Sequence, residues 1–352
     1  MSLDIRSMLP EEIGAALSEM GEKPFRAKQI FSWLSKGVRS FDEMTNLSRD
    51  LRARLGERFW LAPPVPMRKQ VSAEDGTVKF LWRLRDGEMV ESVVMHYDYG
   101  NTVCISTQVG CRMGCAFCAS TLGGLVRNLE PSEMLDQVLW SGLEAGVPIS
   151  NIVLMGIGEP LDNFDAVIRF LLLVNHPDGQ GVGMRHITLS TCGLVDRFDK
   201  MASYDLQLTL SVSLHAPDDE TRSRLVPANR GVGVRALMDA CHRYYERTGR
   251  RVSFEYAMIR DVNDSDRQAE QLAKLVRPMG GHVNLIPLNH VDGRGLSPST
   301  PNRVRRFEDI LKARGVNVTV RRRLGSDIDA SCGQLRRKTG AAPTGSADGG
   351  NR

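Results

Sequence analysis

Three cysteines lie within eight residues, at Cys111, Cys115 and Cys118, with the spacing C-x3-C-x2-C. One short loop with three thiolates can hold one inorganic cluster. A 4Fe-4S cubane has four irons, so three protein ligands leave one iron open to a small molecule, and S-adenosylmethionine uses such an opening for radical chemistry. A structural zinc site is the alternative, but such sites are usually closed tetrahedra, and neither a second C-x2-C pair nor a nearby histidine completes one. The spacing therefore favours an iron–sulfur centre.

Further polar groups stand where predicted strands end. Gly158 and Glu159 lie in GIGEP, where glycine lets a ligand approach the backbone and glutamate can accept a hydrogen bond from an ammonium group. The other candidates are Ser190, Ser213, Leu214, His215 and Asn289, which offer hydroxyl, backbone, imidazole and amide groups to a ribose, a carboxylate or an adenine. Each could also be a capping or core residue. Their shared position at strand ends favours a ligand-binding site.

The elements that must position these groups follow from the apolar pattern after Pro131. Short apolar runs alternate with amphipathic helices, which is typical of βα units that build a parallel sheet. We expect strands at 102–107, 151–155, 186–190, 207–213, 253–259, 282–288 and 317–321, and helices at 132–145, 163–174, 234–248, 265–276 and 302–314. The predicted fold class is α/β, a partial (β/α) barrel of six or seven units whose first strand leads into the cysteine loop.

The chain divides further by composition. Residues 1–62 show helical spacing of apolar residues among arginines, which predicts a small helical module. Residues 63–100 open with three prolines and continue with strand patterns, a β-rich lead-in. Residues 101–338 hold the barrel. Residues 339–352 are rich in glycine and alanine without an apolar anchor, and we expect a disordered tail.

Composition excludes several classes of protein. With 352 residues, 41% hydrophobic and 25% charged, the chain has the profile of a globular protein. Its apolar runs are far shorter than the ~20 residues that cross a bilayer, and its start lacks the apolar core of a signal peptide, so we expect a cytoplasmic protein without membrane contact. Seven cysteines, mostly clustered, do not suit a secreted disulfide framework. Residues 302–338 hold eleven Lys and Arg against four Asp and Glu, which indicates either a polyanion partner or a solvated basic face.

With these motifs in place, the chain resembles the radical S-adenosylmethionine (radical SAM) superfamily and, within it, the RlmN/Cfr family of RNA adenine methyltransferases. The resemblance rests on STQVGCRMGCAFCAST, MGIGEPL, LSTCG, SVSLHAP, HVNLIPLN and DIDASCGQLR, which occur in this order between Ser106 and Arg336. The segments FRAKQIFSWL and FDEMTNLS fit the family's accessory RNA-binding domain. Nearly the whole chain except its tail is covered.

The resemblance implies a reaction and assigns residues to it. Cys332 accepts a methyl group from one S-adenosylmethionine, and a radical generated from a second one activates that methyl for addition to adenine. Glu91 accepts the ring proton, and Cys104 then forms a transient disulfide with Cys332. Gly158, Glu159, Ser190, Ser213, Leu214, His215 and Asn289 contact the cofactor. From its residues alone, Glu91 could equally be an exposed strand carboxylate.

The implied substrate is carbon 2 of an adenine in 23S rRNA and of an adenine in the tRNA anticodon loop. A flavodoxin with its reductase, or a ferredoxin, is the expected electron donor to a protein that acts as a monomer. Two alternatives stay open. One is Cfr-type methylation at carbon 8 of the rRNA adenine, which the shared motifs do not separate from carbon 2. The other is a non-catalytic RNA-binding protein with a structural metal centre.

Overall fold

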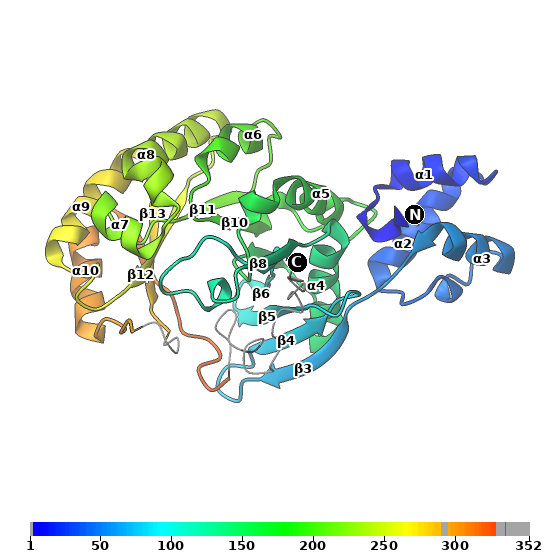
Figure 1. Ribbon diagram of the computed structural model, residues 1–352, viewed down its shortest axis with the longest axis horizontal. Coiled ribbons are helices and arrows are strands. Elements are labelled where there is room, and N and C mark those ends of the chain that lie inside the picture. The colour runs from blue at the N-terminus through cyan, green and yellow to red at the C-terminus, as the bar shows by residue number, and fades with distance from the viewer. Residues whose placement is uncertain (1–2, 290–294, 329–334, 336–352) are drawn as a thin grey trace, which may run out of the picture.

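The computed structural model describes residues 3–289, 295–328 and 335, and a ten-stranded sheet forms its centre (Figure 1). The strands are β1 (Leu3–Asp4), β2 (Phe59–Trp60), β3 (Val65–Val71), β4 (Val78–Arg83), β5 (Met89–Tyr97), β6 (Gly100–Cys104), β7 (Gln108–Gly110), β8 (Leu125–Asn128), β9 (Asn151–Leu154), β10 (Ile187–Thr191), β11 (Thr209–Ser213), β12 (Ser253–Met258), β13 (His282–Pro287) and β14 (Asn317–Val320). The α-helices are α1 (Pro10–Glu19), α2 (Phe25–Lys36), α3 (Arg49–Arg58), α4 (Pro131–Ala145), α5 (Phe164–Asn175), α6 (Phe198–Ala202), α7 (Asp219–Leu225), α8 (Asn229–Thr248), α9 (Asp266–Val276) and α10 (Pro301–Ala313). Among these helices, none is both long and apolar enough to span a membrane.

Seven strands of the central sheet run parallel, in the order β14-β13-β12-β11-β10-β9-β6. Strands β5, β4 and β3 extend the sheet beyond β6 as antiparallel neighbours. Helices α4 to α10 lie along the outer side of the curved sheet (Figure 1). Within the described residues no strand pairing joins β14 to β3, so the barrel stays open. The predicted fold class, a partial (β/α) barrel, is confirmed.

Alternation along the strands separates an apolar outer face from a polar inner face. Leu189, Val212 and Phe254 point outward and belong to the main hydrophobic core with the helices. Because successive side chains of a strand point to opposite faces, Ser190 and Ser213 point inward. The side that the helices leave uncovered is therefore the side that carries the polar candidates.

Several elements were not expected from the sequence. β3 contains Pro66, which argued against a strand, but β3 is the edge of the sheet and its register shifts between Pro66 and Arg68. Proline is tolerated at such an edge or bulge because no ladder hydrogen bond is lost. The short helices α6 and α7 and the hairpin of β7 and β8 also carry too few residues for a clear periodicity.

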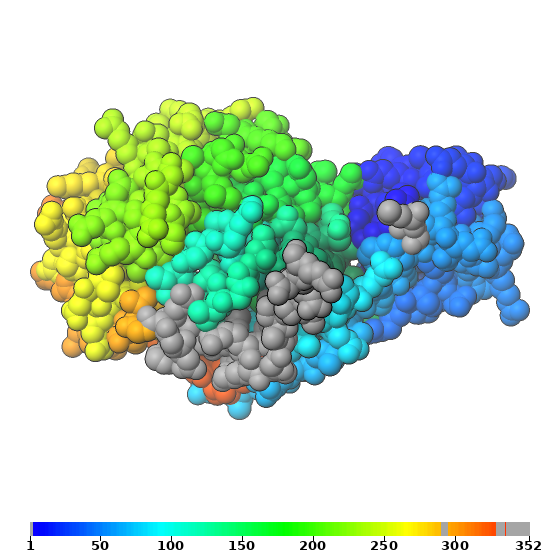
Figure 2. Space-filling view, viewed as in Figure 1, coloured from blue at the N-terminus to red at the C-terminus, as the bar shows by residue number. Residues whose placement is uncertain are grey.

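The N-terminal helices form a separate lobe with its own hydrophobic core (Figure 2). That core includes Leu173 of α5, so the lobe packs directly on the barrel's helical layer. Arg6 forms a buried ion pair with Asp136 of α4 and donates to the carbonyl of Leu34 (2.6 Å). A buried charge needs partners on all sides, and Arg6 obtains them from both modules, which fixes their relative position.

A strap at residues 324–327 crosses the open side of the barrel, from the end of β14 to the turn between β3 and β4 (Figure 1). Asp327 accepts hydrogen bonds from the Ser72 hydroxyl (2.6 Å) and the Ala73 amide (2.8 Å). Asp75 accepts from the Gly325 amide (2.8 Å). Burial opposes the ionisation of Asp75, but these hydrogen bonds, with those of the turn itself, outweigh it and lower its pKa to about 2.

We expect Asp327→Ala to loosen the strap. Two hydrogen bonds disappear, so amide exchange at Ala73 and Gly325 should speed up about fivefold, as hydrogen–deuterium exchange of peptides from the turn and the strap will show. Asp309→Ala, an exposed carboxylate on α10, is the matched control. Because the folded pKa of Asp75 is depressed, the wild-type contact persists at neutral pH and weakens only as pH falls from 3.8 toward 2. Unchanged exchange in Asp327→Ala would show that the hydrogen bonds do not hold the strap.

Candidate active site

A cavity of about 270 Å³ opens at the C-terminal ends of the parallel strands. Its wall contains all three cysteines of the C-x3-C-x2-C loop. Six of the seven predicted cofactor residues also line it, namely Gly158, Glu159, Ser190, Ser213, His215 and Asn289. Leu214 is the exception, because its side chain is fully buried in the main core. A wider groove of about 910 Å³ lies elsewhere, beside α7, α9 and α10, and holds none of the predicted site residues.

The cysteine loop is framed by the hairpin of β7 and β8. The Cys111 amide donates to the Gly124 carbonyl (2.9 Å), which closes the loop at its base. Gly110 has a φ of 79°, and a Cβ there would lie 2.0 Å from the Gly124 oxygen, so only glycine permits this closure. The Ala116 amide donates to the Leu225 carbonyl (2.9 Å), which ties the middle of the loop to α7.

The three thiols suit a cluster with three protein ligands. Burial raises the pKa of Cys111 to about 12 and also raises that of Cys115, and neighbouring thiols in the loop add to both shifts. A bound metal centre overcomes this, because a coordinating thiol is deprotonated outright. Among the described residues no three Cys, His, Asp or Glu side chains are already drawn together as a metal site. The thiols instead share one cavity wall, on one loop, with no fourth ligand of that loop beside them.

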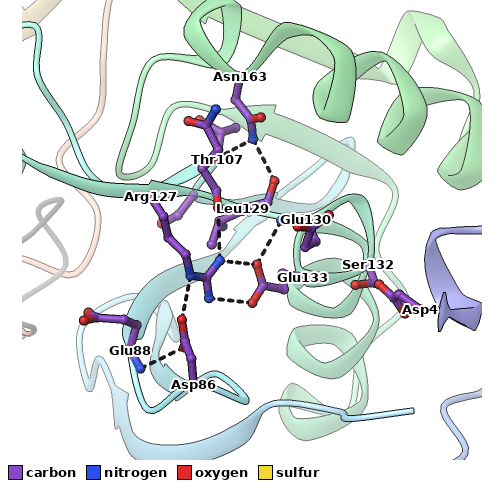
Figure 3. A network of polar contacts seen from close by, with 12 residues as sticks. Asp4, Asp86, Glu88, Thr107, Arg127, Leu129, Glu130, Ser132, Glu133 and Asn163 are labelled. Atoms are coloured by element: carbon purple, nitrogen blue, oxygen red, sulfur yellow. Dashed lines mark hydrogen bonds and ion pairs between the residues drawn. The ribbon is translucent and has the colours of Figure 1, made fainter. Parts of the chain in front are cut away.

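A charged network fixes the hairpin to the barrel (Figure 3). Arg127 of β8 binds Glu133 of α4 through two hydrogen bonds (2.7 and 2.8 Å) and Asp86 of the β4–β5 turn through a third (2.6 Å). Burial opposes the charge of Arg127, but the two carboxylates outweigh it and raise its pKa. Asn163 donates to the carbonyl of Thr107, just before β7 (2.9 Å). Both strands that frame the cysteine loop are thereby anchored.

Gly158 and Glu159 occupy a tight junction between β9 and β7. Gly158 has a φ of 114°, and a Cβ there would lie 2.7 Å from Gln108, so the close approach of two chain segments requires glycine. The buried Glu159 carboxylate accepts from the amides of Leu161 (3.0 Å) and Cys192 (2.8 Å). Burial raises its pKa. The side chains of Thr191 and Cys192 also hydrogen-bond to this carboxylate, which lies in the cavity wall as a hydrogen-bond acceptor.

His215 is a buried, neutral imidazole in the cavity wall. Its Nδ1 accepts from the Ala257 amide (3.0 Å), which leaves the proton on Nε2 as a donor. The ring edge meets Phe117 of the cysteine loop at a centroid distance of 4.7 Å. Burial, with a smaller effect of Arg222, lowers the pKa of His215 to about 3. His215 therefore offers a neutral hydrogen-bond donor to a ligand throughout the physiological range.

We expect His215→Asn to flatten the acid dependence of stability. The unfolded chain binds a proton near pH 6.5 and the folded chain only near 3, so stability is lost as pH falls from 6.5 toward 3. Between pH 7 and 5 this amounts to about 2 kcal/mol for wild type. Asparagine tolerates the left-handed φ of 58° and offers an oxygen to Ala257. Chemical unfolding at both pH values measures the difference, and an equal slope in both proteins would refute the assignment.

Three residues that support or line the cavity were not among the predicted site residues, although Arg321 belongs to the basic C-terminal region. Arg222 of α7 is buried and donates to the carbonyls of Cys192 (2.6 Å), Leu214 (3.0 Å) and Ser213 (3.2 Å), so it holds the ends of β10 and β11 together. Glu255 of β12 lines the cavity, with Arg321 beside it. Glu255 could have been found from the sequence, because it is a charged residue within the apolar run SFEYAM. Arg222 could not, because its short helix α7 was not predicted.

Glu91 of β5 and Cys104 of β6 lie on the inner face of the sheet, where the antiparallel extension meets the parallel strands. Cys104 is paired with Val93 across β6 and β5, and both pack with Met95 in a small cluster that Met155 joins to the cavity wall. The interpretation of Glu91 as an exposed carboxylate is wrong, because its side chain is 3% exposed. The predicted Cys332 lies outside the described residues.

Comparisons with known proteins decide the family. Residues 105–273 match the model of the radical SAM superfamily, and residues 3–61 match the ribosomal RNA large subunit methyltransferase N-terminal domain. A protein of Desulforamulus reducens named "Probable dual-specificity RNA methyltransferase RlmN" is 53% identical over 337 residues, which cover 96% of both chains. Its Bacillus subtilis namesake is 51% identical over 93% of this chain and 91% of its own. The chain belongs to the RlmN family.

The structures agree with this assignment. The crystal structure of a radical SAM methyltransferase from Sphaerobacter thermophilus superposes with a TM-score of 0.90 at 44% identity, over 94% of this chain and 98% of its own. This member of the RlmN family is thus a radical SAM RNA methyltransferase. These findings contradict the non-catalytic alternative. The match to the family also includes the N-terminal lobe, because the family model of the N-terminal domain covers the chain from β1 to β2.

Proposed function

We propose that this enzyme methylates carbon 2 of an adenine in 23S rRNA and carbon 2 of an adenine in the tRNA anticodon loop, through an S-methylcysteine at Cys332. The observation that carries the proposal is the cavity in which the three cysteines of one loop meet Glu159, Ser213 and His215. When bound there, a 4Fe-4S cluster and S-adenosylmethionine, two molecules per turnover, supply the methyl group and the radical that activates it. A flavodoxin with its reductase, or a ferredoxin, provides electrons to the monomeric protein in the cytoplasm.

The chain's own residues divide the remaining work. Glu159 accepts from the ammonium group of the cofactor's methionine, and Ser190, Ser213, His215 and Asn289 bind its carboxylate, ribose and adenine, with Gly158 and Leu214 contributing backbone. A carbon radical is needed because carbon 2 of adenine is not nucleophilic and cannot attack a sulfonium methyl directly. Glu91 then takes the ring proton from the covalent adduct.

Cys104 releases the product by thiol exchange, and a two-electron thiol reductant must then reduce the resulting disulfide. Its thiolate attacks the sulfur of Cys332, so an S–S bond forms and the bond from that sulfur to the methylene carbon breaks. The carbon keeps the electron pair and takes a proton, which releases methyladenine. The strap supports this pairing, because Leu324 packs against the cluster that contains Cys104, only eight residues before Cys332.

The RNA is expected to reach the cavity along the basic C-terminal region, with the adenine turned out of its stack. Arg322 is exposed there, whereas Arg323 donates to the carbonyl of the cavity residue Leu288 (2.9 Å). Arg322 is therefore the cleaner probe of phosphate contacts. Arg322→Ala should weaken RNA binding in a salt-dependent way and leave the methylation of Cys332 unchanged.

Mass spectrometry tests the proposed function. Anaerobically reconstituted protein is incubated with S-adenosylmethionine and mapped by peptides, and rRNA and tRNA from cells that express it in place of their own enzyme are digested to nucleosides. We expect a methyl group on the Cys332 peptide and 2-methyladenosine in both RNAs. Formation of 8-methyladenosine would instead establish the Cfr-type activity. An unmodified Cys332 in protein that holds its cluster would overturn the proposal.

A further inference from the structure

A buried ion pair lies beside the predicted proton acceptor. The Lys79 ammonium of β4 is 2.8 Å from the Glu91 carboxylate of β5, and their side chains are 0% and 3% exposed. Taking two charges out of water is expensive, and their mutual attraction often does no more than offset that cost. A buried ion pair is therefore weak evidence for a role in stability. Its position in the barrel is the better guide to what it does.

The register places the pair on the inner face, level with Cys104. Lys79 is opposite Val93, and Val93 is opposite Cys104, so the three positions form one row across β4, β5 and β6. Glu91 lies two residues from Val93 on the same face. The Ser106 hydroxyl donates to the Glu91 carbonyl (2.7 Å), so Glu91 lies beyond Cys104 toward the end of β6 that leads to the cysteine loop. The neighbouring Phe80 and Val90 point outward into the main core.

Structural needs do not account for this pair. The other ion pair with both side chains buried among the described residues, Arg6 with Asp136, joins the N-terminal lobe to the barrel. Lys79 and Glu91 instead connect β4 to β5, two strands that already pair along six positions. Two apolar residues would pack there at lower cost. We therefore look for the role of the two charges at the inner face of the barrel.

We infer that Lys79 is a positioning residue for Glu91, whose ion pair holds this carboxylate on the inner wall for proton abstraction from the adenine ring. The inference rests on the proposed function. A buried carboxylate without a counter-charge binds a proton and can no longer accept one from the substrate. Lys79 places such a counter-charge 2.8 Å from the buried Glu91 carboxylate.

The proton transfer itself is simple to balance. The bond from the ring carbon to hydrogen breaks, its electron pair stays in the ring, and the proton forms an O–H bond with Glu91. The one unpaired electron that the radical addition leaves on the adduct would return to the iron–sulfur cluster that the three cysteines would hold. Lys79 acts through its contact with Glu91 and takes no part in the bonds that form or break. Removal of its charge should therefore change when Glu91 is ionised, and leave the earlier methylation of Cys332 intact.

The test compares Lys79→Met, Glu91→Gln and Arg6→Met in the cluster-reconstituted full chain. Single-turnover RNA methylation is measured from pH 6 to 9 on protein whose Cys332 has been methylated beforehand and quantified. We expect Lys79→Met to lower the methylation rate about tenfold at neutral pH. The rate should recover as pH rises, because the acidic limb of the pH–rate profile moves up by about one pH unit. Glu91→Gln should be slow at every pH. Arg6→Met should lose stability and keep the wild-type profile.

The outcomes separate the inference from the function it rests on. A wild-type pH profile for Lys79→Met overturns the role of Lys79. Unmethylated Cys332, or full activity of Glu91→Gln, contradicts the proposed function itself. If the methionine variant does not fold, Lys79→Gln replaces it. Glutamine keeps a hydrogen-bond donor toward Glu91 without the charge, so the same shift of the pH–rate profile is expected.

Discussion

Cys115→Ala is expected to abolish both the methylation of Cys332 and that of RNA, to below about one part in a thousand of wild type. Cys115 stands at the centre of the cysteine loop, and the loop holds only three thiols for a cluster. Alanine leaves two, so the cluster is not retained. Iron and sulfide analysis, with the visible absorption of the reconstituted protein, measures the first loss, and mass spectrometry of Cys332 and of digested RNA measures the second.

The matched control is Cys241→Ala. Cys241 is fully buried in α8, within the main core and away from the cavity wall. This variant should lose about 1 kcal/mol or more of stability through the removed sulfur and keep its full iron content. Retention of a complete, active cluster by Cys115→Ala would mean that another residue replaces this ligand. The assignment of the loop would then be wrong.

Arg222→Met is expected to destabilise the protein by about 3 kcal/mol or more and to weaken the binding of S-adenosylmethionine. Methionine fills similar space, but the carbonyls of Cys192, Ser213 and Leu214 lose their donor. Each buried polar group left without a partner costs about 1–3 kcal/mol. These carbonyls belong to the strand ends that line the cavity. Thermal unfolding should show a midpoint lower by roughly 4 °C.

The binding of S-adenosylmethionine by Arg222→Met, measured by equilibrium dialysis, should fall about tenfold because the loosened strand ends must be ordered again when the ligand binds. Arg224→Ala, an exposed arginine on the same helix, is the control and should change neither quantity. If Arg222→Met kept wild-type stability, the hydrogen bonds to the strand ends would not be holding the cavity wall.

The sequence by itself determined the cysteine loop, the parallel strands and the polar residues at their ends. These features are local, because ligand spacing, the alternation of a strand and the C-terminal end of a βα unit are all contained in short segments. Six cofactor candidates thus reached one cavity without knowledge of the strand order. Leu214 did not, since the residue next to an inward-facing Ser213 must face the core.

Only the tertiary structure decided which distant groups meet. The contact of Lys79 with Glu91 depends on the register of β4 and β5. The sequence does not reveal it, because a lysine and a glutamate on exposed strands would have the same spacing. The strap contact between Asp75 and Gly325 joins residues 250 positions apart. The curvature of the sheet brings β14 and β3 close enough for 324–327 to cross, and the sequence has no local signature of curvature. Arg222 likewise acquires its role from the convergence of two strand ends.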